Sequence, residues 1–120
     1  HAIEVGMGYG SWVHGEAVGA GMVMASELSL RAGLIVADDA RRARALVAAA
    51  GLRVTGPAEL SADRYLELMS VDKKAAGGRI RFILLEAIGR ALMRDDIPAE
   101  LVRTVIDGCS GRGTAAFRAA

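Results

Sequence analysis

Two histidines, His1 and His14, are the side chains of this sequence best suited to binding a metal ion or transferring a proton. An imidazole can do either near neutral pH. His14 is followed by small Gly15 and acidic Glu16, which leaves room beside its ring, and a glycine-rich turn separates it from His1, so the two rings could converge. Two histidines alone do not complete a catalytic zinc site, which needs about three protein ligands and an open position. Without further context, either histidine could also be an ordinary surface or core residue.

Lys73 and Lys74 are the only lysines among the 15 basic residues, and the other 13 are arginines. In a chain so biased toward arginine, a retained lysine indicates a need for a compact ammonium group rather than a planar guanidinium. A phosphate or carboxylate group would be a suitable partner. The alternative is a pair of solvated loop lysines.

The elements that must position these residues are mostly helices. Glycines, caps and apolar periodicity predict where each begins and ends. We expect the end of a helix over 1–7, then a helix over 11–31 with Ser11 as its cap, and helices over 38–50 and 62–69, the latter capped by Ser61. A loop over 72–78 should follow, and then a β-hairpin of strands 79–85 and 91–94 that turns at Gly89. The last expected element is a helix that begins at Pro98 and ends near Cys109.

The expected fold class is therefore mainly α, with four to five helices plus a small β-hairpin. The 11–31 helix is apolar or small on nearly every face, which is typical of a central helix packed on several sides. No βαβ unit is visible, and the glycine cluster of residues 6–10 is not a dinucleotide loop because no strand precedes it, so we assign no cofactor-binding residue. Residues 110–120 are rich in Gly, Ala and Arg and are expected to form a loose tail.

Bulk composition excludes several classes of protein. The net charge of +1 argues against a nucleic-acid partner held by a basic field. The sequence contains no apolar run of about 18 residues, so we expect no membrane partner. Its single cysteine, Cys109, cannot form an intramolecular disulfide. With no signal peptide, a reducing cytoplasm is the expected location. The chain opens on His1 without Met, so we expect a piece of a longer protein.

Two blocks of the sequence together resemble the 3-dehydroquinate synthases. The first comprises HAIE at residues 1–4, GMGYG at 6–10, WVHGEAV at 12–18 and GMVM at 21–24. The second comprises DKK at residues 72–74 and GRIRF at 78–82. The spacing between the blocks also matches, and the resemblance extends over about residues 1–109.

That resemblance implies a two-domain enzyme with an N-terminal α/β domain that holds NAD. The C-terminal helical domain, here residues 1–109, brings a divalent metal, zinc or cobalt, to the cleft. The implied reaction converts DAHP, a seven-carbon sugar acid phosphate, to 3-dehydroquinate with loss of phosphate, in the shikimate pathway. The implied partner is thus a small-molecule sugar acid phosphate, and the family forms homodimers.

Residue by residue, the resemblance implies that His14 is a metal ligand and His1 a substrate-contacting acid or base. Lys73 matches a lysine that binds the anionic groups of the substrate, and its neighbour Lys74 is a weaker match. Glu16 falls where it supports His14 or the helix start rather than acting as a base. The other histidine and glutamate ligands of the family lie upstream of this sequence. We therefore expect these 120 residues alone to be inactive.

Two alternatives remain open on the sequence. Another sugar phosphate cyclase, such as 2-deoxy-scyllo-inosose synthase, would share the metal motif. A non-catalytic helical module, in which His1 and His14 are structural, is a different class of protein. Cys109 is interpreted as a small buried or half-buried residue in each case.

Overall fold

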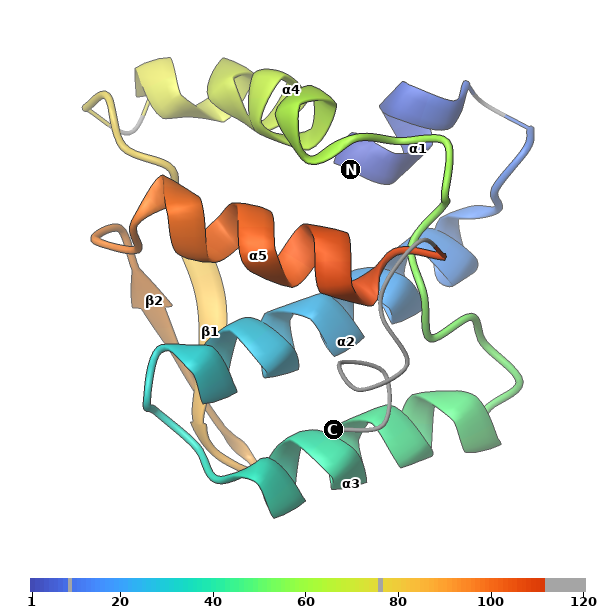
Figure 1. Ribbon diagram of the computed structural model, residues 1–120, viewed down its shortest axis with the longest axis vertical. Helices are drawn as coiled ribbons and strands as arrows, with labels where there is room; N and C mark the ends of the chain where they lie inside the picture. The colour runs from blue at the N-terminus through green and yellow to red at the C-terminus, as the bar shows by residue number, and fades with distance from the viewer. Residues whose placement is uncertain (9, 76, 112–120) are drawn as a thin grey trace.

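The computed structural model describes residues 1–8, 10–75 and 77–111, apart from the side chains of residues 72–75. Within these residues the chain is mainly helical with one two-stranded antiparallel hairpin, as predicted. Its elements, in order, are α1 (Ala2–Met7), α2 (His14–Arg31), α3 (Ala37–Ala49), α4 (Ala62–Ala75), β1 (Phe82–Ala87), β2 (Arg90–Arg94) and α5 (Ala99–Cys109) (Figure 1).

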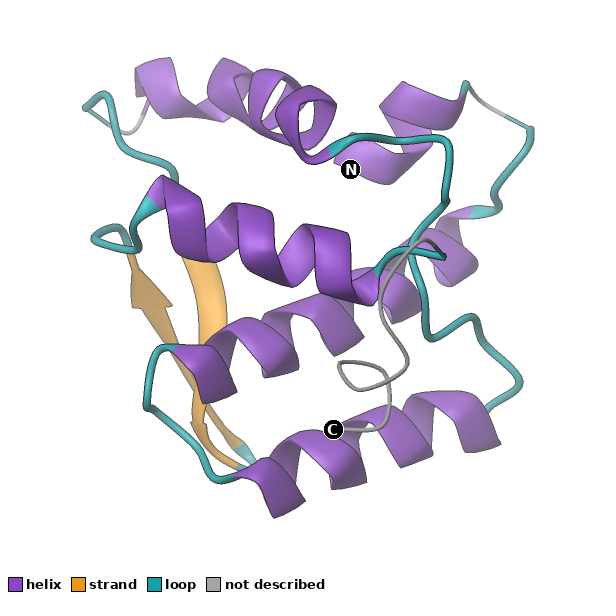
Figure 2. Cartoon of the chain, viewed as in Figure 1, coloured by secondary structure: helices purple, strands orange, loops and turns teal. Residues whose placement is uncertain are grey.

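Helix α2 is the centre of the fold. It contacts α1, α3, α5 and β1, whereas the main contacts of α4 among the described elements are with α1 and α5. In Figure 1, α5 lies between α4 and α2, and α3 lies along the other side of α2. The hairpin stands at one edge of these helical layers (Figure 2). This arrangement confirms that the predicted 11–31 helix, observed as α2, is central to the fold.

Small residues allow the other helices to approach α2 closely. Ala20 is completely buried, and a Cβ added to Gly19 would lie 3.1 Å from the Cβ of Leu52. That separation is tighter than most real Cβ contacts, so Leu52 would have to shift to admit a larger residue where α2 meets the segment after α3. The helix is not covered on every side, because the side chains of Val18 and Met22 remain exposed.

A buried serine joins α2 to the hairpin. The Ser29 hydroxyl donates to the carbonyl oxygen of Ala25 at 2.7 Å and accepts a bond from the backbone N–H of Leu85 at 2.9 Å. Ser29 is completely buried, and its hydroxyl satisfies the part-buried N–H of a strand residue.

The start of α2 differs from the prediction. Ser11 does not cap the helix; Val13 is the N-cap residue, in an extended conformation, and no side chain caps the helix end. Gly10 has a φ of 104° and Ser11 lies in the turn, while Trp12 is buried. Burying the indole keeps the backbone out of helical geometry until His14, which becomes the first residue of the helix.

Glycines end the next two helices as predicted. Gly33 follows α2 with a φ of 78°, and Gly51 follows α3 with a φ of 79°. Both lie in the left-handed region that favours glycine after a helix. Helix α3 begins one residue earlier than predicted, at Ala37, and Asp38 and Asp39 lie in its first turn.

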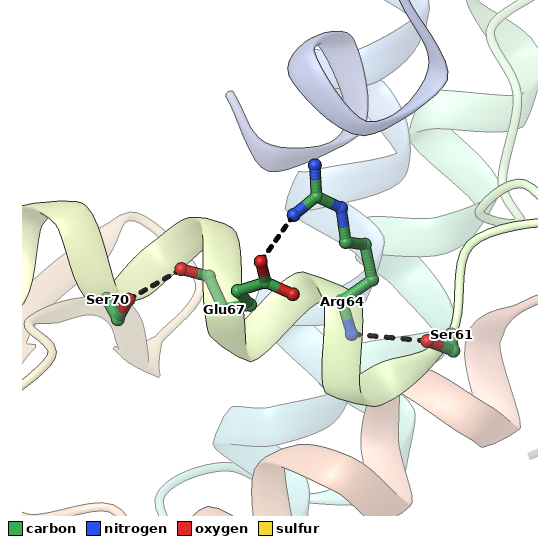
Figure 3. A network of polar contacts seen from close by, with 4 residues as sticks. All are labelled: Ser61, Arg64, Glu67 and Ser70. Atoms are coloured by element: carbon green, nitrogen blue, oxygen red, sulfur yellow. Dashed lines mark hydrogen bonds and ion pairs between the residues drawn. The ribbon is translucent and has the colours of Figure 1, made fainter.

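Helix α4 is longer than predicted. Ser61 caps it through a bond from the Arg64 N–H at 3.2 Å, and the Arg64–Glu67 ion pair and the bond from Ser70 to the Glu67 carbonyl follow along the helix (Figure 3). The helix continues to Ala75, so the predicted loop over 72–78 is wrong for its first residues. Because no glycine or proline interrupts the chain before Gly77, nothing ends the helix at residue 69.

The hairpin forms around the predicted turn at Gly89, but its first strand is shifted. The prediction began that strand at residue 79, whereas β1 begins at Phe82, which pairs with Arg94 at the end of β2. The Arg94 guanidinium binds both carboxylate oxygens of Asp96 as the chain leaves the sheet. Residues 79–81 therefore have no partner strand. Leu84 lies in the core and is almost fully buried.

At the C-terminal end, α5 follows Pro98 and ends at Cys109, close to the predicted helix. Ser110, which the prediction put in a loose tail, is completely buried and pairs with Gly56. The rest of that predicted tail, residues 112–120, lies outside the described residues. No helix in the described part of the chain is long and apolar enough to cross a membrane.

Cys109 lies in the core, which confirms the interpretation of a small buried residue. Burial, with a smaller contribution from the nearby Glu27 carboxylate, raises the pKa of the thiol to about 12. The thiol therefore stays protonated near neutral pH and is a poor nucleophile.

Replacing Ser29 should destabilise the fold. We expect Ser29→Ala to lower the free energy of unfolding by about 1–3 kcal/mol, because the part-buried N–H of Leu85 loses its acceptor. Ser26→Ala is the matched control, since among the described residues the Ser26 hydroxyl bonds only the Met22 carbonyl within its own helix. Urea denaturation measures both variants, and an equal loss in the two would contradict the coupling of α2 to β1.

Alkylation tests the burial of Cys109. At about pH 8, iodoacetamide should modify the folded chain on the order of a thousandfold more slowly than the unfolded chain, because the thiolate fraction is that much smaller. Since the folded pKa is raised, the stability that the neutral thiol contributes is present below about pH 8.5 and declines as the pH rises toward 12. Equal alkylation rates in the two states would show that the thiol is accessible.

Candidate functional site

His14 and Glu4 form a polar pair across the glycine-rich turn. His14 is the first residue of α2, and its side chain is 78% exposed. Its Nδ1 lies 2.9 Å from Oε1 of Glu4, whose side chain projects from α1 and is only 17% exposed. The turn between α1 and α2 thus brings together two residues that are ten positions apart.

This bond leaves one ring nitrogen of His14 for another partner. In the neutral tautomer with its proton on Nδ1, the ring donates to Glu4, and Nε2 carries a lone pair. A carboxylate on the far nitrogen fixes both the tautomer and the orientation of a metal-binding histidine. His14 is thus suited to be a metal ligand held by Glu4. The sequence prediction omits Glu4, although it lies in the quoted motif; a carboxylate near a candidate histidine was the only signal for it.

The described residues do not contain a complete metal site. No group of three or more His, Cys, Asp or Glu side chains among them could hold a metal ion. His14 and Glu4 are two adjacent groups, fewer than the three or four protein ligands of a zinc site. His14 fits one ligand position, and the others would have to come from outside these residues.

No hydrogen bond or ion pair joins His1 to His14 in the described part of the chain, and their convergence stays a prediction. Among the described contacts, the partner of the His14 ring is Glu4, and His1 stands at the N-cap of α1. His1 is exposed and borders a cavity of about 150 Å³ between α1, α2, α4 and α5. The lining of that cavity is otherwise apolar and includes Gly21, Met24 and Phe82, with Tyr65 adding a phenol. An acid or base role for His1 stays a prediction.

Glu16 lies in the first turn of α2 and is engaged by an arginine. Its Oε2 is 2.5 Å from Nε of Arg53, and the Arg53 guanidinium also lies over the Trp12 ring, 4.2 Å from its centroid. An acidic residue in the first turn stabilises a helix by its position near the positive end of the dipole. This arrangement favours the supporting interpretation of Glu16 over a role as a base.

Lys73 and Lys74 lie on the last turns of α4 rather than in the predicted loop. Their side chains lie outside the described residues, so their predicted contact with an anionic substrate is untested.

The candidate site residues lie in a part of the chain that is similar to known proteins. A family model described as "3-dehydroquinate synthase C-terminal" matches residues 1–75, which include His1, Glu4, His14 and Lys73. Curated proteins are similar over more of the sequence.

Two relatives are named 3-dehydroquinate synthase. That of Nitrosospira multiformis is 50% identical over 110 residues, which cover 92% of this chain and 30% of the relative. That of Azotobacter vinelandii is 49% identical over 107 residues, which cover 89% of this chain and 29% of the relative. The chain thus spans about 30% of the length of these curated relatives.

Proposed function

Because this chain belongs to the 3-dehydroquinate synthase family and matches the family's C-terminal part, we propose that the polypeptide containing this chain converts DAHP to 3-dehydroquinate and phosphate. The observation that carries this proposal is the identity of about 50% to two proteins of that name over nine-tenths of the chain. The reaction would place the protein in the shikimate pathway of aromatic amino acid biosynthesis, as a lyase in the cytoplasm.

We assign His14 the role of a ligand to a divalent metal, zinc or cobalt. The bond from its Nδ1 to Glu4 supports this role, because it presents Nε2 to a metal and restrains the ring. The remaining ligands would come from elsewhere in the polypeptide. When bound, such a metal polarises hydroxyl and carbonyl oxygens as a Lewis acid.

The other site residues act on the substrate in this proposal. His1 would exchange a proton with the sugar acid phosphate, and its exposed position at the mouth of an apolar cavity is compatible with that role. Lys73, and secondarily Lys74, would offset the charge of the phosphate or carboxylate. Both lysines lie at the C-terminal end of α4, just before Gly77 and Gly78, and would contact the substrate from there.

The described residues lack the unit that commonly holds a dinucleotide. They contain no strand followed by a glycine-rich loop and a helix. We propose that NAD binds another part of the polypeptide, and we assign no step of its chemistry to this chain. The working form would be a homodimer acting on a small-molecule substrate.

Metal affinity tests the Glu4–His14 pair. In the full-length polypeptide, His14→Ala should lower zinc affinity by more than about a hundredfold because a ligand is lost, and Glu4→Gln should lower it roughly ten- to a hundredfold. Glu67→Gln is the matched control, since Glu67 is an exposed glutamate paired only with Arg64 among the described residues. Titration with a competing chelator measures each value.

Unchanged zinc affinity in His14→Ala would reject the ligand role and favour a non-catalytic helical module. If zinc affinity falls in His14→Ala but not in Glu4→Gln, His14 is still supported as a metal ligand, but the proposal that Glu4 restrains it is rejected.

Phosphate release from DAHP tests the reaction. The full-length polypeptide should release phosphate, and His14→Ala should lower kcat by at least about a hundredfold because Lewis-acid activation is lost. Lys73→Met should raise KM about tenfold, since a charge-assisted contact with the substrate is removed, and Lys74→Met should have a smaller effect. Absence of phosphate release from DAHP by the wild type would favour another sugar phosphate cyclase, such as 2-deoxy-scyllo-inosose synthase.

A further inference from the structure

Arg53 reaches the start of α2 from a distant part of the chain. It lies two residues beyond Gly51, in the segment between α3 and α4. Its guanidinium contacts two side chains on either side of His14 in sequence, Trp12 and Glu16. No motif of the sequence singles out Arg53, so its contacts with the residues that flank the candidate metal ligand emerge only from the fold.

The contact with Glu16 is a charge pair with one oxygen shielded from water. Oε2 of Glu16 has less than 1 Å² exposed, and it lies 2.5 Å from Nε of Arg53. Among the described residues, no hydrogen-bond donor with good geometry serves that oxygen. Removal of the Arg53 charge would therefore leave a carboxylate oxygen shielded and without its counter-charge, and the first turn of α2 would have to rearrange to hydrate it.

The contact with Trp12 fixes the residues that precede the helix. The guanidinium carbon lies 4.2 Å from the centroid of the indole ring, within the range of a cation–π interaction. Trp12 is buried, so its backbone is anchored in the core. Arg53 therefore connects the anchored end of the turn to the first turn of α2.

Close packing holds Arg53 in place. Its neighbour Leu52 packs against Gly19 of α2, where even a methyl group would be 3.1 Å from the Leu52 Cβ. The Arg53 backbone is therefore positioned relative to α2 by the core, while its side chain stays 53% exposed. An exposed pair of this kind contributes little to global stability, so its main effect should be local.

We propose that Arg53 is a positioning residue that sets the orientation of His14. It holds Trp12 and Glu16, two residues before and two residues after His14, while Glu4 holds the His14 ring. Backbone and ring are then restrained by two separate contacts before a metal arrives. A restrained ligand loses less freedom on binding, so metal affinity and coordination geometry both depend on Arg53. The inference rests on the proposed metal role of His14.

Cobalt titration of the full-length polypeptide tests the proposal, because the visible absorption of bound Co²⁺ reports ligand geometry. Arg53→Ala should weaken Co²⁺ affinity roughly three- to tenfold and shift the absorption bands, and Arg53→Lys should recover part of the loss by keeping the charge. Arg41→Ala is the matched control. Its side chain is 54% exposed and pairs with Asp38 on α3, away from the start of α2. It should leave affinity and spectrum unchanged.

A second variant separates local positioning from loss of folding. Glu16→Gln keeps the shape of the side chain and leaves Arg53 over Trp12, and it should weaken Co²⁺ affinity in the same direction. Because each single variant already removes the contact between Arg53 and Glu16, the double variant should lose less affinity than the sum of the two single losses in free energy. Urea denaturation of each variant checks that the fold is retained.

The outcomes also separate this inference from the proposed function. If His14→Ala abolishes Co²⁺ binding but Arg53→Ala and Glu16→Gln match the Arg41→Ala control in affinity and spectrum, the positioning role is wrong and the metal role stands. If His14→Ala leaves Co²⁺ binding intact, the metal role is wrong and the positioning role fails with it.

Discussion

Close packing around α2 is the constraint on which the other features of the fold depend. A helix that contacts α1, α3, α5 and β1 must present small residues where backbones approach, and it does so at Gly19 and Ala20. It must also satisfy any polar group that the packing buries. Ser29 meets that requirement for the Leu85 N–H, so the helix and the hairpin are joined by a directional bond as well as by apolar contact.

The candidate site follows from where this rigid helix begins. His14 is its first residue, and the turn that precedes it returns the chain from α1, which brings Glu4 against the imidazole. The same close packing positions Leu52 against Gly19 and so presents Arg53 to Glu16. Polar contacts at the exposed end of α2 are therefore set by apolar contacts along its length. A rigid scaffold of this kind is what a metal ligand needs if its geometry is to be fixed before the metal binds.

Much of the fold could be predicted because its boundaries are local. Gly33, Gly51 and Gly89 stop or turn the chain through their own φ angles, and Ser61 caps α4 through a hydroxyl three residues from its partner. The errors arose where distant contacts decide. Ser11 looked like a cap, but burial of Trp12 delays the helix, and β1 begins only where Arg94 supplies a partner. The same holds for the candidate site. His14 could be identified by its residue type, whereas its bond to Glu4 and the contact of Arg53 with Glu16 depend on how distant parts of the chain come together.

We propose that His14, restrained by Glu4, is a metal ligand in the full-length polypeptide. The most direct measurement is anomalous diffraction at the zinc edge from crystals of the full-length polypeptide. A zinc peak is expected about 2.0–2.1 Å from Nε2 of His14, with Nδ1 still bonded to Glu4. A zinc peak at another site, with the His14 ring uncoordinated, would contradict this proposal.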